Sequence, residues 1–424
     1  MACFKRHNFI SSLSPLYYTS KFLGLAPYDL YATVNNTNNK RSIKTVFSVI
    51  YTFLIACLVL ALSIHQYYYF WINVFPRQTS NFILADTLSK LLLYGTPLNY
   101  LILSVVYKRR LSSLLLAIHK VDQKIVTKHK VYTIIYIILI IEVIASISVI
   151  VGLYQFIDFT WGLKPYFNFF YEGFVHLLAL IGDMQYVSVL LYVKFIYKSL
   201  NNEMNYFVDR SSNSRSDVIR NSNNTIFSIV DRHNDIRINL PSSSKNKTNA
   251  TNVRKQMKYD DIRRFMAIYK DLQEISELIH SYFNWQIVFE TSSLFIGIVS
   301  TSYDTVNVFK GFLKRNSQQL LYFFRVMSLA AWVVYYGSNL FLICLSGNLC
   351  RNEAHNTFKT VHKLLLNRFL KPQVSRDLES FAVCYTSNKL HITACGIFPI
   401  DMTLFQMVIA AAFVYLCYSF ATMR

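Results

Sequence analysis

Seven long apolar stretches divide this chain, and they constrain its fold more than any other feature. Each is long enough to cross a bilayer core of roughly 30 Å, for which a helix needs about 20 mostly apolar residues. A backbone inside lipid has to form its own hydrogen bonds, so each stretch is expected to be helical. The predicted spans are Thr45–Phe70, Phe82–Tyr107, Val131–Gln155, Phe169–Ile196, Phe283–Phe309, Gln319–Asn348 and Phe398–Ala421. The sequence therefore predicts an all-α membrane protein with seven transmembrane helices.

Positive charge lies mainly on one side of these spans. The long segment between spans four and five does not count reliably towards orientation, but without it 20 Lys and Arg residues still lie on one side against 6 on the other. The positive-inside rule then places the amino terminus in the cytoplasm. Seven crossings place the carboxyl terminus outside the cell. The net charge of +20 is explained by this distribution, without a nucleic acid partner.

The segments between the spans predict how the chain is organised. Short outer loops leave no room for an extracellular domain, so a ligand has to be met within the helix bundle. Inside, Asp209–Thr251 is rich in Ser and Asn and predicts a disordered linker. The periodic segments Val253–Tyr282 and Arg351–Leu370 predict long cytoplasmic helix extensions of spans five and six, with Pro372 ending the second. Asp377–Leu390 predicts a short amphipathic helix. The expected divisions are a cytoplasmic segment 1–44, spans one to four in 45–196, a disordered cytoplasmic linker 197–252, helix extensions with spans five and six in 253–397, and span seven with its extracellular tail in 398–424.

No motif indicates catalysis or a cofactor. The chain lacks a Gly-rich phosphate loop, a His-Glu-x-x-His pair and a Gly-x-Ser-x-Gly turn. The seven cysteines fall inside the cell or within spans on this topology, so no disulfide framework is expected. Their spacing does not suit a metal. We therefore predict a protein that is not an enzyme and that carries no metal or cofactor.

A few ionisable residues interrupt the apolar spans, namely Glu142, Asp183, Glu290 and Arg325. A charge in the bilayer interior costs about 2.5–3.5 kcal/mol even on lenient scales, so each needs a reason. One explanation is ligand contact, ion passage or gating, and the other is a structural pair between helices. For Glu142 and Glu290 the structural explanation is favoured over ligand contact, ion passage or gating. A proton-coupled transporter that uses these two residues is a separate alternative. Asp86 and Lys90, four residues apart, are expected to pair along one helix face.

The outer halves of spans one to six are rich in aromatic and polar residues. An aromatic-lined cavity with a few polar groups is typical of small-molecule sites, although Tyr and Trp also collect at membrane interfaces. The candidate ligand-binding residues are Tyr67, Tyr94, Glu172, His176, Tyr303, Asp304, Asn307, Tyr322, Phe323, Arg325 and Trp332.

The last span differs from the others because Met402–Phe420 holds no formal charge and has small residues at Ala410–Ala412. Such a helix suits either a hydrophobic constriction that gates by dewetting or an ordinary packed helix. Spacing alone does not separate the two.

The chain resembles the insect gustatory receptor family in several short motifs. The motifs are Phe22-Leu23-Gly24-Leu25-Ala26-Pro27, Tyr269–Phe283, Asn352–Thr357 with its Glu353-Ala354, and Thr393-Ala394-Cys395-Gly396-Ile397-Phe398. The family's terminal signature is Thr-Tyr, five hydrophobic residues, then Gln-Phe. Here Phe420 matches, Phe413 is an aromatic exchange, and Ala412 and Ser419 depart. This erosion favours a divergent receptor for bitter or plant compounds.

The resemblance implies a tastant-gated, non-selective cation channel in the plasma membrane of sensory neurons. It implies a homotetramer, or a hetero-oligomer with related receptors, whose seventh helices line the pore. The implied gate residues are Phe420, Ser419, Leu416 and Phe413. The alternative is a seven-helix receptor that signals through a cytoplasmic partner at the cluster Lys108-Arg109-Arg110, which the charge distribution disfavours.

Overall fold

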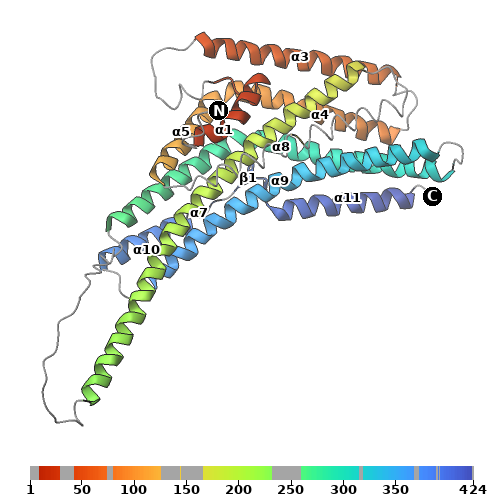
Figure 1. Ribbon diagram of the computed structural model, residues 1–424. Helices are drawn as coiled ribbons and strands as arrows, with labels where there is room; N and C mark the ends of the chain where they lie inside the picture. The colour runs from red at the N-terminus through yellow and green to blue at the C-terminus, as the bar shows by residue number, and fades with distance from the viewer. Residues whose placement is uncertain are drawn as a thin grey trace, which may run out of the picture. The chain divides into compact units, whose positions relative to one another are not determined.

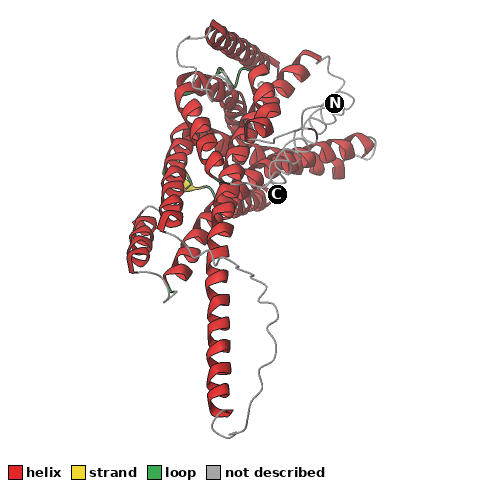
Figure 2. Cartoon of the chain, turned by 60° about the vertical axis from the view of Figure 1, so that its left-hand side comes forward, coloured by secondary structure: helices red, strands yellow, loops and turns green. Residues whose placement is uncertain are grey.

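A computed structural model describes residues 9–28, 43–73, 80–125, 144, 166–231, 259–314, 319–366, 372–387, 390 and 392–422. These residues are almost entirely helical, as predicted, and Figure 2 shows one small strand pair among them. The helices are α1 (Phe9–Phe22), α3 (Ile43–Asn73), α4 (Ser80–Val106), α5 (Lys108–Lys124), α7 (Tyr166–Asp231), α8 (Tyr259–Lys314), α9 (Gln319–Leu365), α10 (Pro372–Ser387) and α11 (Met402–Thr422). The strands β1 (Thr393–Ala394) and β2 (Phe398–Pro399) pair antiparallel, with Ala394 opposite Phe398.

Most predicted spans coincide with helices. Spans one and four to six lie within α3, α7, α8 and α9, and span two matches α4 to within two residues. Span three falls outside the described residues except for residue 144. By length and apolar composition, three described segments are able to cross a membrane, at Thr45–Tyr68, Glu172–Tyr206 and Phe323–Leu365. Met402–Tyr418 is a shorter apolar helix. The predicted start of span seven at Phe398 differs from the structure, because Phe398–Pro399 forms β2 and the helix begins at Met402.

The helices also continue beyond the apolar runs. α8 is continuous from Tyr259, and α9 runs past span six to Leu365, as the helical period predicts. Two boundaries differ from expectation. α7 continues to Asp231, so part of the predicted linker is helical, because an established helix gains one hydrogen bond for each residue that it adds. Pro372 is the first residue of α10, where its missing N–H costs nothing.

The chain forms two compact units, which are described separately. The first unit comprises Met1–Ile196, Asp271–Asn352 and Leu390–Arg424, and the second comprises Tyr197–Lys270 and Glu353–Lys389. A core cluster in the first unit joins the segment after α1 to α3, α4 and α7. Its members are Leu23, Leu25, Ile55, Val59, Tyr100, Leu101, Leu178 and Ile181. Figure 1 shows α3 and α4 running beside one another in this unit, in line with their contacts.

The second unit is held by aromatic and polar contacts between its helices. The Tyr269 ring lies 5.0 Å from that of Phe381 and 5.6 Å from that of Tyr385. The Tyr385 hydroxyl donates to the Ala354 carbonyl oxygen at 3.0 Å. Asn201 donates to the Glu353 carbonyl oxygen at 2.9 Å. The Glu353-Ala354 motif is therefore a backbone anchor point for two other segments of this unit.

Candidate functional site

The carboxyl-terminal helix α11 is largely uncovered in the single chain. Its buried and half-buried residues are Met402 and Phe405 near the start and, at every fourth position, Leu404, Val408, Ala412 and Leu416, which form one narrow stripe. The rings of Phe405 and of Phe341 on α9 lie 5.4 Å apart, and Figure 1 shows α11 beside α9. Elsewhere α11 presents large apolar side chains, with Phe413 66% exposed. An uncharged helix that is apolar on all sides requires lipid or another subunit to cover it.

The structure separates the predicted gate residues. Leu416 belongs to the packed stripe, whereas Phe413 lies on the uncovered side. Position 420 follows position 413 by seven residues, which returns to nearly the same helical face. The side chains of Ser419 and Phe420 lie outside the described part of the structure.

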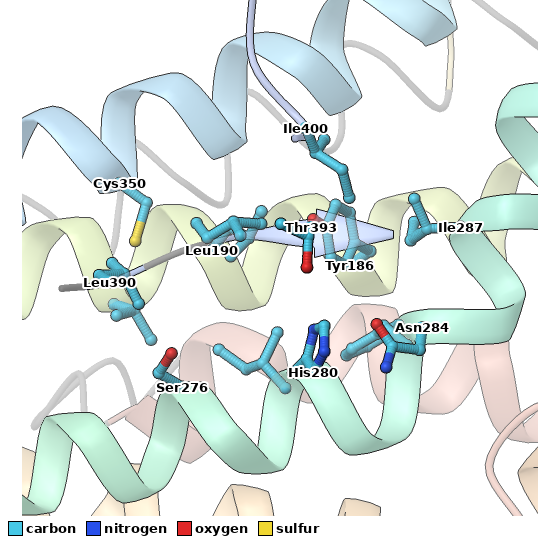
Figure 3. A pocket seen from close by; sticks show the side chains of 14 residues that line it. Tyr186, Leu190, Ser276, His280, Asn284, Ile287, Cys350, Leu390, Thr393 and Ile400 are labelled. Atoms are coloured by element: carbon cyan, nitrogen blue, oxygen red, sulfur yellow. The ribbon is translucent and has the colours of Figure 1, made fainter. Parts of the chain in front are cut away.

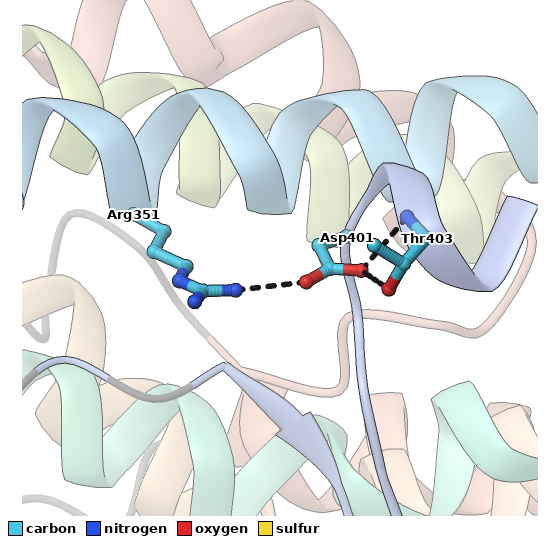
Figure 4. A network of polar contacts seen from close by, with 3 residues as sticks. All are labelled: Arg351, Asp401 and Thr403. Atoms are coloured by element: carbon cyan, nitrogen blue, oxygen red, sulfur yellow. Dashed lines mark hydrogen bonds and ion pairs between the residues drawn. The ribbon is translucent and has the colours of Figure 1, made fainter.

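A compact polar joint fixes the start of α11 (Figure 4). Asp401 precedes the helix, and its Oδ1 accepts a hydrogen bond from the Thr403 backbone N–H at 2.9 Å, the geometry of an N-cap. The Thr403 hydroxyl also donates to this oxygen. Arg351 on α9 donates from Nη1 to the other carboxylate oxygen at 2.8 Å. The joint therefore links α9 directly to the first turn of α11.

The electrostatics of this joint keep Asp401 ionised. Burial raises the pKa of the Asp401 carboxyl, but hydrogen bonds from Thr403 and from the Leu404 backbone lower it, as does the charge of Arg351. The net pKa lies below the usual value of 3.8. The Arg351 side chain is half exposed and that of Asp401 is 9% exposed, so solvent screens the ion pair in part. The negative charge also suits the positive end of the helix dipole.

The β1–β2 hairpin leads into this joint. Cys395 and Gly396 form its turn with positive φ angles, and the Ile397 N–H donates to the Ala394 carbonyl oxygen at 2.9 Å. The Cys395 N–H donates to Asn284 Oδ1 on α8 at 3.1 Å. Sequence reasoning singled out Cys395-Gly396 only as a motif. Gly396 before Phe398-Pro399 is the signal that a turn, and not a helix, opens this segment.

A small cavity lies next to the hairpin (Figure 3). Its volume is about 20 Å³, which is room for about one water molecule. Tyr186 and Leu190 of α7, His280 and Asn284 of α8, and Cys350 of α9 contribute to its wall, with residues of the hairpin. The Tyr186 hydroxyl is buried without a hydrogen-bond partner in the described structure. The cavity shows that packing around the hairpin is not complete.

Two of the predicted ligand-binding residues meet in an aromatic cluster between α7 and α9. The ring of His176 lies 4.8 Å from that of Trp332, and both side chains are buried. Tyr335 and Tyr336 complete the cluster, with ring centroids 5.7 and 6.0 Å from His176. Sequence reasoning missed these two tyrosines, although they follow Trp332 at the helical spacings of three and four.

The other candidate ligand-binding residues are dispersed. Tyr94 packs in a separate cluster with Val175, Leu62 and Leu93. Tyr303 instead contacts Tyr415 of α11, with ring centroids 6.4 Å apart. Phe323 is exposed, and the half-buried members are Tyr67, Glu172, Asp304, Asn307 and Arg325. The side chain of Tyr322 lies outside the described residues.

The ionisable residues within the spans include one buried group. The Tyr100 hydroxyl of α4 donates to Asp183 Oδ1 of α7 at 2.7 Å. Glu290 of α8 adjoins Asp183, and both carboxyl groups are at least 97% buried. The group joins three helices, as expected for a structural role. Glu142 and the Asp86 side chain fall outside the described residues, so the predicted Asp86–Lys90 pair stays a prediction.

Comparison with known proteins identifies relatives of this chain. The family model described as 7tm Chemosensory receptor matches residues 13–419. Gustatory receptor 28b of Drosophila melanogaster is 27% identical over 155 residues, which cover 37% of this chain. The match spans about a third of that protein's length. The olfactory receptor OR5 of Machilis hrabei has a similar fold, with a TM-score of 0.61 at 12% identity over 96% of this chain and 97% of that chain. The same receptor solved in complex with eugenol gives a TM-score of 0.62 at 12% identity, over 97% of this chain and 98% of that one.

Proposed function

Because the chain belongs to the seven-transmembrane chemosensory receptor family, whose members are membrane-embedded receptors, we propose that it is a gustatory receptor that acts as a tastant-gated, non-selective cation channel. Four copies assemble around a pore, as a homotetramer or with related receptors. The assembly lies in the plasma membrane of sensory neurons, with the amino terminus inside and the carboxyl terminus outside. The charge distribution of the loops supports this orientation.

The uncovered face of α11 is the observation that carries the pore proposal. This helix carries no charge, and on that face the Phe413 ring is 66% exposed in the described part of the structure. Copies of α11 around a central axis would cover part of it and present the rest to a pore that closes by dewetting. Phe420 is the proposed gate, with Ser419 and Phe413 next to it, and Leu416 is proposed to hold the helix in place from the packed stripe.

The ligand region is proposed at the His176–Trp332 cluster. Glu172 precedes His176 by four residues on α7, and Tyr94 packs against Val175, the residue before His176. The cluster is aromatic and includes the imidazole of His176, whose ring nitrogens are able to donate or accept a hydrogen bond. Such a site suits a small molecule with a ring and a polar group. The Machilis hrabei receptor that shares the fold was solved with eugenol. We propose a plant compound of the bitter type as the tastant.

The hairpin and the Arg351–Asp401 joint are proposed to carry motion from the bundle to the pore. The joint ties α9, which also bears Trp332, to the first turn of α11. A ligand shifts the channel towards the open state only if it binds that state better than the closed state. Movement of α9 that favours ligand contact would then displace the inner end of α11.

Recording currents from cells that express the chain tests the proposal. We expect cation currents in response to members of a panel of alkaloids, glycosides and sugars. Trp332→Ala should shift the dose–response curve, and Phe420→Ala should change the current at saturating ligand. Silence across the panel, alone and with related receptors, would count against a tastant-gated channel.

The orientation is tested separately. An epitope tag at the carboxyl terminus should be accessible to antibody on intact cells, and a tag at the amino terminus should not. The sequons at Asn246 and Asn249 lie in the proposed cytoplasmic linker and should carry no glycan. Glycan at either site would reverse the orientation and would favour the alternative of a receptor that signals through a cytoplasmic partner.

A further inference from the structure

The junction between α1 and α3 contains a groove that the proposed channel function does not use. It is lined by Tyr18, Lys21, Phe22, Phe47, Ser48 and Tyr51, and its volume is about 560 Å³. The four aromatic side chains are all exposed, and Lys21 is the cation among the described residues that line the groove. An exposed aromatic surface of this kind marks an interaction site.

The groove is a built feature, because the end of α1 is fixed on α3. The Leu25 N–H donates to the Ser20 carbonyl oxygen at 2.7 Å and the Gly24 N–H to that of Lys21 at 3.2 Å, which together form a Schellman motif. Gly24 adopts a φ of 76°, and a Cβ there would lie 3.1 Å from the Ile55 side chain and 3.3 Å from Thr52 Cα. Glycine is therefore required at this point.

Two further hydrogen bonds fasten the same junction. The Thr52 hydroxyl donates to the Gly24 carbonyl oxygen at 2.8 Å, and the Tyr51 hydroxyl donates to that of Phe22 at 2.7 Å. The Gly24-Leu25-Ala26 motif thus holds the two walls of the groove at a fixed separation. Leu25 and Ala26 are buried behind it.

The position of the groove identifies its surroundings. Among the described candidate spans α3 is the most apolar, and only 22% of its most apolar window is buried, so in a membrane most of its surface would be left for lipid. Phe47 and Tyr51 lie in its first three turns, near the end where a spanning helix meets the headgroup region. The aromatic walls are therefore continuous with the lipid-facing surface of α3.

Lys21 supplies the charge that selects an occupant. Its Nζ donates to the Tyr17 hydroxyl at 3.1 Å and lies 5.4 Å from the centre of that ring, so the ammonium group is held beside the groove. An ammonium group and a hydroxyl that line the same groove, here those of Lys21 and Ser48, suit a phosphate, and exposed aromatic rings suit acyl chains. We propose that the α1–α3 groove binds an anionic phospholipid, with the phosphate at Lys21 and an acyl chain along Phe22 and Phe47.

Native mass spectrometry of the full-length purified protein tests this proposal. The probes are palmitoyl-oleoyl phosphatidylserine and, for comparison, the zwitterionic phosphatidylcholine with the same chains. We expect the wild-type chain to retain the anionic lipid preferentially. Lys21→Gln should weaken its retention about fivefold, the effect of one surface cation. The matched control Lys120→Gln removes an exposed lysine of α5 and should change nothing. Equal retention of the two lipids, or equal effects of the two variants, would overturn the proposal.

Photo-crosslinking identifies the occupant directly. A photo-reactive benzoylphenylalanine in place of Phe22 should crosslink to phospholipid in the native membrane. Crosslinking instead to a second copy of the chain, or to residues 29–42 of the same chain, would show a different occupant and would refute the lipid site. Both measurements are independent of channel currents. Failure of the tastant-gated channel would leave them unchanged, and loss of lipid binding would not touch the channel proposal.

Discussion

α7 and α11 are both apolar helices of the kind that crosses membranes, yet they meet opposite surroundings. In α7, 78% of the most apolar window is buried, and the helix carries buried polar groups such as His176, Asp183 and Ser188. α11 carries no formal charge, and most of its large side chains are exposed. A helix enclosed by its own chain is able to hold polar groups, because neighbouring helices pair with them. A helix left open has to remain apolar until lipid or other subunits cover it.

The largest effect on stability is expected at Asp183. Asp183→Ala removes the acceptor of the buried Tyr100 hydroxyl and leaves a cavity beside Glu290. We expect a loss of about 2–4 kcal/mol in the free energy of unfolding. Thermal unfolding of the purified receptor measures this loss. Asp183→Asn keeps an acceptor for Tyr100 and should lose less. Equal loss in both variants would show that the hydrogen bond is not what holds the three helices.

A smaller loss is expected where α7 meets Tyr100 at Gly182. A Cβ at this position would lie 2.8 Å from the Tyr100 ring, which is buried and whose hydroxyl is hydrogen-bonded to Asp183. Gly182→Ala should cost about 1–3 kcal/mol. Gly337→Ala in α9 is the matched control, because a Cβ there meets nothing within 4 Å. It should be neutral or stabilise the helix by about 0.5–1 kcal/mol. A reversed order would show that α7 is less tightly enclosed than its burial indicates.

At the start of α11, the expected loss is that of a helix cap. Asp401→Ala removes the acceptor for Thr403 and the partner of Arg351, and should cost about 0.5–2 kcal/mol. Asp401→Asn retains the cap and should cost less. In recordings, we expect Asp401→Ala to weaken the response to ligand more than its effect on stability explains. An unchanged dose–response curve would show that the Arg351–Asp401 joint takes no part in gating.

The pH dependence of this joint follows from the Asp401 pKa. Because that pKa is lowered in the folded chain, the stabilisation is fully present above the usual value of 3.8 and is lost as the pH falls through the folded value. The difference in melting temperature between wild type and Asp401→Asn should therefore stay constant from about pH 8 to pH 5. It should shrink only in stronger acid. If this difference in melting temperature changed between pH 7 and pH 5, the hydrogen bonds and Arg351 would not be lowering the Asp401 pKa.

The smallest effect on stability is expected on the uncovered face of α11. Phe413→Ala removes an exposed ring and should leave the free energy of unfolding within about 0.5 kcal/mol of wild type. It should nevertheless alter the current if this face lines the pore. Leu416→Ala, on the packed stripe, should lower the free energy of unfolding more than Phe413→Ala does and should change the current less. Equal behaviour of the two variants would remove the distinction between the two faces.

The sequence predicted where the helices lie along the chain better than it predicted which helices pack against one another. Apolar length alone identified α3, α7 and α9, because a span needs a fixed number of apolar residues. The same criterion does not reveal that α3 is largely open while α7 is enclosed, since burial depends on which helices pack together. The Tyr100–Asp183 bond joins residues 83 positions apart and has no sequence signal. The hairpin was missed because Phe398, Pro399 and Ile400 are as apolar as the helix that follows.

The capping role of Asp401 has a consequence for conduction. A carboxylate directed to its own helix terminus and to Arg351 is not available to attract permeating ions, and Met402–Thr422 contributes no other fixed charge. A pore lined by such helices would present only hydroxyl and amide dipoles to the ions, without a ring of charged side chains that selects one cation over another. Sodium, potassium and calcium should then pass with similar ease, and reversal potentials measured under bi-ionic conditions should lie close to zero.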